Sequence, residues 1–162
     1  MKCLDIEIAV AEHFNPRVNL IVPNVHWGFG IHECDLLIVS GRGYATEVEI
    51  KVSTGDLKND MKKKHKHESS KVNYLYFAIP EQLLSYIEFI PKRAGIICIG
   101  SEKSVKYSSS YSSGKAIYPC RIHRPAERCG NYQMTLDERF AIARLGTMRI
   151  WRLKQKLASE YK

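Results

Sequence analysis

The feature that most constrains the fold is a strand–turn–strand pattern between residues 35 and 52. The segment Asp35–Val39 is apolar after its opening acid, and Ser40–Gly43 has the composition of a turn. The next segment, Tyr44–Val52, alternates charged and apolar residues, as a strand with one buried face does. These residues predict a β-hairpin.

The charged side chains of this hairpin are expected at one edge. Glu49 and Lys51 are two residues apart and point to the same face of a strand, and folding the hairpin brings Asp35 beside them. Glu47 shares that face, so it is either an outer metal ligand or a neighbour of the site. We prefer Glu49 because of its two-residue spacing to Lys51. Carboxylates that lie close together are stabilised by a nearby metal ion or lysine. A site of carboxylates, a metal ion and a lysine is suited to hydrolysis of a phosphodiester.

The same residues resemble the PD-(D/E)xK nuclease superfamily, whose core pattern is an Asp, a spacer and Glu-x-Lys. The stretch from His32-Glu33-Cys34-Asp35 through Glu49-Ile50-Lys51-Val52-Ser53 is most similar to its MmcB-like DNA repair branch and related phage-encoded nucleases. The polar helix expected next strengthens the likeness through Asp56, Asp60 and Lys64. The resemblance covers roughly the first hundred residues.

The resemblance implies a Mg²⁺-dependent deoxyribonuclease, with Mn²⁺ as a substitute, acting in DNA repair, recombination or phage DNA processing. It implies Asp35 and Glu49 as metal ligands with the Ile50 backbone carbonyl, and Lys51 as the residue that orients water or stabilises the transition state. Two alternatives stay open: a catalytically inactive nucleic-acid binding protein of the same fold, and an RNA nuclease.

A further acid is expected on the first helix. In relatives similar to Holliday junction resolvases, a glutamate there often completes the metal shell. Glu12, near the end of the predicted helix, is the preferred candidate for a catalytic ligand, and Glu7 is the poorer one.

The helix after the hairpin carries polar residues suited to support a site or to bind phosphates. Roles in supporting the metal ligands or in positioning the substrate are expected for Glu47, Ser53, Asp56, Asp60 and Lys64. Contacts with nucleic acid are expected from basic residues on this helix and on the last one, namely Lys62, Lys63, Lys64, Lys66, Arg149 and Arg152.

The order of elements predicts an α/β fold with a mixed central sheet flanked by helices, and the resemblance makes this a restriction-endonuclease-like core with a C-terminal helical extension. Residues 1–100 are the expected core, 101–134 a Ser/Tyr-rich loop with an edge strand, and 135–162 the extension, all packed as one domain. The predicted elements are a helix over Cys3–Phe14, strands over Val18–Val25, Val72–Ile79 and Arg93–Gly100, a helix from Ser53 or Thr54 to about Glu68, and a short helix over Glu81–Phe89.

The helical extension has its own signals. Thr135 and Glu138 predict a capping box, and Gly146 is expected to break or bend the helix. The expected buried residues are Leu4, Ile8 and Ala11 on the first helix, then Leu136, Phe140 and Ala143, and finally Ile150, Leu153 and Leu157.

Composition narrows the partners. The 162 residues carry a net charge of +8, which favours a polyanion such as DNA. No apolar run is long enough to span a bilayer, the N-terminus lacks signal-peptide character, and five irregularly spaced cysteines suggest reduced thiols in the cytoplasm. Cys120, His123 and Cys129 fall short of the four ligands of a structural zinc site, so ordinary thiols are favoured. A homodimer stays open.

Overall fold

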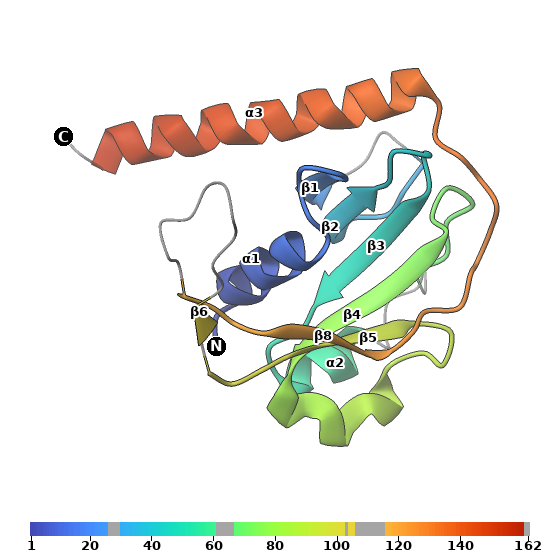
Figure 1. The fold of residues 1–162 in the computed structure, drawn as a ribbon, viewed down its shortest axis with the longest axis vertical. Helices are drawn as coiled ribbons and strands as arrows, with labels where there is room; N and C mark the ends of the chain where they lie inside the picture. The colour runs from blue at the N-terminus through green and yellow to red at the C-terminus, as the bar shows by residue number, and fades with distance from the viewer. Residues whose placement is uncertain (26–29, 61–66, 103, 106–115, 161–162) are drawn as a thin grey trace.

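A mixed six-stranded sheet forms the centre of the computed structural model (Figure 1). The structure describes residues 1–25, 30–60, 67–102, 104–105 and 116–160. The sheet strands are β1 (Leu20–Val25), β2 (Cys34–Val39), β3 (Ala45–Ile50), β4 (Tyr74–Pro80), β5 (Gly95–Ile99) and β8 (Cys120–Arg124). The other elements are α1 (Cys3–His13), α2 (Thr54–Asp60), the 3₁₀ helix η1 (Glu81–Phe89), α3 (Leu136–Glu160), and the short pair β6 (Ser104–Val105) and β7 (Ala116–Ile117).

The sheet order β1-β2-β3-β4-β5-β8 combines antiparallel and parallel pairs. Strands β1, β2 and β3 are antiparallel, β3, β4 and β5 are parallel, and β8 is antiparallel to β5. Pro23 lies in β1, an edge strand, where its missing amide hydrogen costs least. The expected α/β class, with a mixed sheet flanked by helices and a C-terminal helix, is confirmed.

Two apolar layers cover the sheet. On one face α1 packs through Ile6, Ala9 and Val10 against a cluster that includes Val48 and Ile50 of β3. The opposite face is covered by α2 and η1 at one end, and by the first half of α3 at the other; the contacts of these three helices are made by Leu57, Leu83 and Ile142. The alternation of β3 therefore sends Val48 and Ile50 toward α1, and Glu47 and Glu49 toward α2.

The buried side of α1 differs from the expected one. Leu4 and Ile8 are 61% and 37% exposed, whereas Ile6 and Val10 are fully buried. Helical spacing alone allowed both sides, because apolar residues lie on each. Ile6, Ala9 and Val10 form the compact side that fits against the sheet.

The helix after the hairpin was expected to reach about Glu68, but it does not extend that far. His67 and Glu68 lie outside any helix, and His67 has a left-handed φ of 55°. Residues 61–66 lie outside the described residues, and with them the predicted roles of Lys62, Lys63, Lys64 and Lys66.

The capping box at the start of α3 is confirmed. The Thr135 amide donates to Glu138 Oε2 at 2.9 Å, and the Glu138 amide donates to Thr135 Oγ1 at 3.2 Å. Gly146 does not break α3, which is continuous from Leu136 to Glu160. A Cβ at Gly146 would lie 3.4 Å from Val22 Cγ2, an ordinary van der Waals contact, so this turn of α3 packs against β1.

The expected apolar packing of α3 is wrong. Leu136 and Phe140 are 74% and 70% exposed, and Ile150, Leu153 and Leu157 are 44% to 58% exposed. The sheet instead receives Ile142, with Leu145 partly buried beside it. Figure 1 shows why: α3 crosses near β1, and its C-terminal part extends beyond the sheet. Among the described helices, none combines the length and apolar character needed to cross a membrane.

We expect Glu138 to stabilise the junction between α3 and the body. Its carboxylate accepts bonds from Lys71 Nζ at 2.5 Å, from the Thr135 amide and from the Tyr132 hydroxyl, and Lys71 and Thr135 lower its pKa from 4.5 to about 2. Glu138→Gln should lower the free energy of unfolding by about 1–2 kcal/mol at pH 7. Urea unfolding of the variant and wild type measures this difference.

The pH dependence follows from the lowered pKa of Glu138. The stabilisation is complete above about pH 4.5 and is lost as the pH falls through about 2. The difference between wild type and Glu138→Gln should therefore shrink over that range. Asp137→Asn, a change of the exposed neighbouring acid, is the control. Equal stability of Glu138→Gln and wild type at pH 7 would contradict the role of Glu138.

Candidate active site

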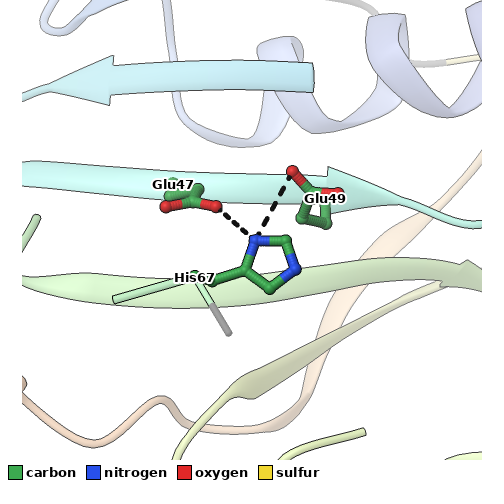
Figure 2. A group of neighbouring side chains, drawn as sticks. All are labelled: Glu47, Glu49 and His67. Atoms are coloured by element: carbon green, nitrogen blue, oxygen red, sulfur yellow. Dashed lines mark hydrogen bonds and ion pairs between the residues drawn. The ribbon is translucent and has the colours of Figure 1, made fainter. Parts of the chain in front are cut away.

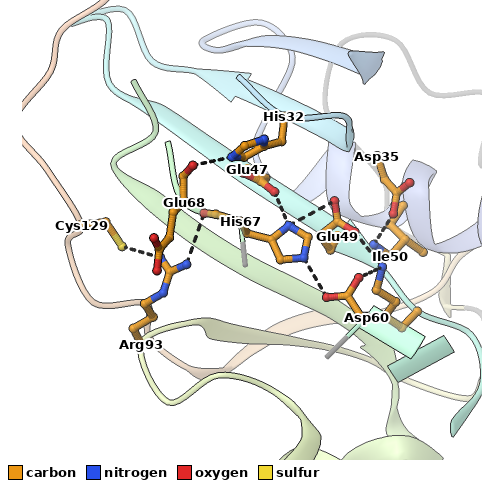
Figure 3. Close-up of polar contacts among 11 residues, drawn as sticks. His32, Asp35, Glu47, Glu49, Ile50, Asp60, His67, Glu68, Arg93 and Cys129 are labelled. Atoms are coloured by element: carbon orange, nitrogen blue, oxygen red, sulfur yellow. Dashed lines mark hydrogen bonds and ion pairs between the residues drawn. The ribbon is translucent and has the colours of Figure 1, made fainter. Parts of the chain in front are cut away.

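The hairpin brings Asp35 to the end of β3. Asp35 Oδ2 accepts a hydrogen bond of 2.7 Å from the Ile50 amide, which fixes the first acid of β2 beside the last residue of β3 (Figure 3). An open pocket of about 280 Å³ lies here, and its lining includes Asp35, Glu49, Ile50 and Lys51. Glu33, Asp56, Asn59 and Asp60 complete its walls. The structure thus brings together the residues predicted from the hairpin.

Lys51 is held between two carboxylates. Its Nζ lies 2.7 Å from Glu49 Oε2 and 2.9 Å from Asp60 Oδ1, and the residue is 7% exposed. Burial alone would lower the pKa of Lys51, but Glu49 and Asp60 outweigh it, so the pKa is raised. Lys51 therefore carries its positive charge at neutral pH.

Helix α2 positions Asp60. The Ser53 hydroxyl accepts a hydrogen bond of 3.2 Å from the Asp56 amide and donates one of 2.8 Å to the Asp56 carboxylate, so Ser53 caps the helix as expected. Leu57 is fully buried and anchors α2, and Asp60 follows it by three residues, nearly one turn. Ser53 has a structural role, Asp56 lines the pocket and Asp60 holds Lys51.

His67 is a site residue that the sequence patterns missed. The ring lies between two buried carboxylates, with Nδ1 2.7 Å from Glu47 Oε1 and Nε2 2.7 Å from Asp60 Oδ2 (Figures 2 and 3). Arg93 donates a hydrogen bond to the His67 carbonyl at 3.2 Å. Burial lowers the pKa of His67, but the bonds to Asp60 and Glu47 outweigh it and raise the pKa from 6.5 to about 9.

Negative and positive side chains therefore alternate in the buried network of charged residues around Lys51 and His67. Glu47, Glu49 and Asp60 supply three carboxylates, and Lys51 and His67 supply two cations. Burial raises the pKa of Glu47, an effect that His67 opposes. Because both ring nitrogens of His67 face carboxylates, the imidazolium form satisfies both contacts at once.

One group of side chains has the spacing of a metal site, and a second candidate group shares Glu49 with it. In the buried group, Glu47, Glu49 and His67 each contribute one ligand atom, and these three atoms lie within 4.8 Å of one another. All three residues are buried. The other group is Asp35, Glu49 and the Ile50 carbonyl, hard oxygen donors on residues that line the open pocket. Because the carboxylates raise the pKa of His67, a metal ion bound to the buried group would have to displace a proton from the ring, whereas the second group lines a pocket open to a substrate.

The α1 acid close to this edge is Glu7 rather than Glu12. Glu7 is half-buried, and its pKa is raised by burial and by the nearby Asp35 carboxylate. Glu12 is exposed and does not line the pocket of Asp35 and Glu49. Glu7 does not line the pocket either, but it is the acid of α1 that interacts electrostatically with Asp35, so it joins Glu12 as a candidate for the further acid.

The remaining predicted residues lie away from this pocket. Arg149 is half-buried and donates a hydrogen bond to the Asn24 carbonyl, which joins α3 to β1. Arg152 is exposed. The structure joins none of the cysteines in a disulfide, and within the described ranges Cys120, His123 and Cys129 do not form a group with metal-ligand spacing.

Comparison with known proteins supports the fold. No protein-family model matches the chain, and no curated protein sequence matches it. Among solved structures, it is similar to a protein of unknown function from Silicibacter pomeroyi, with a TM-score of 0.62 and 15% sequence identity. The match covers 99% of this chain and 94% of that one. At this identity the likeness shows a shared fold alone.

We expect His67 to be essential to stability because it neutralises two buried carboxylates. His67→Asn tolerates the left-handed backbone but loses the charge and the double contact. The free energy of unfolding should fall by about 3–5 kcal/mol. Urea unfolding measures the loss, with the exposed His123→Asn as control. A change as small as that of the control would contradict this role.

Proposed function

We propose that this chain is a Mg²⁺-dependent nuclease that hydrolyses DNA phosphodiester bonds, with Mn²⁺ able to substitute. The observation that carries the proposal is the shared pocket of Asp35, Glu49, Ile50 and Lys51 at the end of β3. Two carboxylates, a main-chain carbonyl and a lysine are the donor set of a metal-dependent phosphodiesterase. The resemblance to PD-(D/E)xK nucleases, carried by the same residues, points to the same chemistry.

Asp35, Glu49 and the Ile50 carbonyl would hold the metal ion, and Glu7 is the nearest further acid on α1. The ion, when bound, would neutralise charge on the phosphate and lower the pKa of a water molecule. Lys51 keeps its ammonium group at the same edge through Glu49 and Asp60. From there it can donate to the attacking water or to a phosphate oxygen as negative charge develops.

The charge of the chain supports a nucleic-acid partner. A net charge of +8 favours association with a polyanion, and exposed basic residues such as Arg152 add to it. We place the activity in DNA repair, recombination or phage DNA processing on the resemblance to MmcB-like proteins. Five cysteines without a disulfide bond accord with a cytoplasmic location.

Cleavage assays on single-stranded, duplex and branched DNA test the proposal. Wild-type protein should cut DNA with Mg²⁺ or Mn²⁺, and EDTA should abolish cleavage. Asp35→Ala and Lys51→Ala should each lower the rate at least ~100-fold, because the first removes a proposed metal ligand and the second removes the ammonium group proposed to act on the water or the phosphate. Glu88→Ala, a change of an exposed acid on η1, is the matched control. Far-UV circular dichroism checks that each variant is folded.

Three other outcomes of these assays would contradict the proposed site or favour another function. Undiminished cleavage by folded Asp35→Ala or Lys51→Ala would contradict the assignment of the site. Cleavage of RNA but not DNA would indicate an RNA nuclease. Binding of DNA without cleavage under either metal would favour a catalytically inactive nucleic-acid binding protein.

A further inference from the structure

His67 is connected to Lys51 by a chain of two buried contacts (Figure 3). Its Nε2 lies 2.7 Å from Asp60 Oδ2, and the other oxygen of that carboxylate, Oδ1, lies 2.9 Å from Lys51 Nζ. His67, Asp60 and Lys51 are all buried. Asp60 and Lys51 line the pocket of Asp35 and Glu49, but His67 is not among the described residues that do so. The influence of His67 on Lys51 therefore passes through Asp60.

The ring of His67 is itself held from several directions. Its Nδ1 lies 2.7 Å from Glu47 Oε1, and its carbonyl accepts a hydrogen bond from Arg93. The ring packs edge-on against Phe77, with the two ring centroids 5.7 Å apart and the planes at 82°. A side chain with these contacts has little freedom to rotate, so its Nε2 fixes the orientation of the Asp60 carboxylate.

Lys51 needs such an anchor because its side chain is a flexible four-carbon stem. The Lys51 amide donates to the Ala78 carbonyl at 3.0 Å, which fixes the backbone but not the ammonium group. Nζ lies 5.8 Å from the centroid of the Phe77 ring, between Glu49 and Asp60. In the proposed function Glu49 also holds a metal ion, and two cations on one carboxylate repel each other. Asp60 is therefore the better anchor for Lys51 in the working site.

We propose that His67 is a positioning residue of the nuclease reaction. It orients Asp60, and Asp60 keeps the ammonium group of Lys51 at the pocket while Glu49 is engaged with the metal ion. This inference rests on the proposed function. Because His67 touches neither DNA nor metal in this scheme, its loss should lower kcat rather than raise the KM for DNA.

Acetylation of lysines, followed by mass spectrometry, measures the anchor without a cleavage assay. Asp60→Asn should raise the labelling rate of Lys51 at least ~10-fold, because Lys51 then loses a charge-assisted hydrogen bond. Glu49→Gln should raise that rate less than ~3-fold, because Asp60 still holds the ammonium group. Lys71, which pairs with Glu138, is the internal control for folding, and its rate should not change. Faster labelling of Lys51 in Glu49→Gln than in Asp60→Asn would overturn the role of Asp60.

Cleavage of DNA with Mg²⁺ tests His67 itself. His67→Gly suits the left-handed backbone and removes the ring, and an open cavity of about 490 Å³ beside His67, lined also by Arg93 and Cys129, can admit added imidazole. The variant should lose at least ~10-fold in kcat, with a change in KM of less than ~3-fold, and imidazole should restore part of kcat. His123→Gly, a change of an exposed histidine, should show neither the loss nor the gain.

Combination with Lys51→Ala separates positioning from folding. If His67 acts through Lys51, His67→Gly should lower the kcat of Lys51→Ala by less than ~2-fold, because the group that it positions is already absent. If His67→Gly does not fold, Asp60→Asn takes its place in the same comparison.

Two results would overturn the positioning role of His67. One is a folded His67→Gly variant with the kcat of wild type. The other is an undiminished loss of kcat when His67→Gly is added to Lys51→Ala. Failure of the proposed function is distinguishable from both, because Lys51→Ala would then cleave as fast as wild type, and the labelling of Lys51 would still decide whether Asp60 anchors it.

Discussion

Three carboxylates lie buried side by side at the ends of β3 and α2, and the structure depends on how their charge is balanced. An unpaired buried carboxylate costs several kcal/mol, so Glu47, Glu49 and Asp60 require cations within contact distance. Lys51 supplies one from β3 itself. His67 supplies the other from beyond α2, and its left-handed backbone and the bond from Arg93 hold the ring in place.

The acids at the end of β3 lie in different surroundings, and this difference determines which of them face the open pocket. Glu47 and Asp60 are committed to His67 and Lys51 inside the protein, while Asp35 lies half-exposed at the mouth of the pocket, fixed by the Ile50 amide. Glu49 stands between the two environments, contacting Lys51 and bordering the pocket. The network therefore holds Lys51 and Glu49 in fixed positions beside the open pocket, which is the preorganisation that the proposed hydrolytic site requires.

Local patterns predicted the hairpin, the Asp35–Glu49–Lys51 edge and the capping box of α3, because each depends on spacing within one or two neighbouring elements. His67 could not be predicted in this way. It lies sixteen residues after Lys51, outside any helix or strand, and its role exists only after the chain returns to place β4 beside β3. The apolar residues of α3 were predicted to be buried because amphipathic spacing shows that a face needs a partner. Amphipathic spacing does not show whether that partner is the sheet of the same protein or another molecule.

The most direct test of the central claim is which acids bind a divalent ion. Isothermal titration calorimetry with Mn²⁺ on wild type, Asp35→Asn and Glu47→Gln separates the pocket group from the buried group, which share Glu49. We predict a single Mn²⁺ site in wild type that is lost in folded Asp35→Asn and kept in folded Glu47→Gln. Unchanged binding in Asp35→Asn, with loss in Glu47→Gln, would contradict a metal centre in the open pocket.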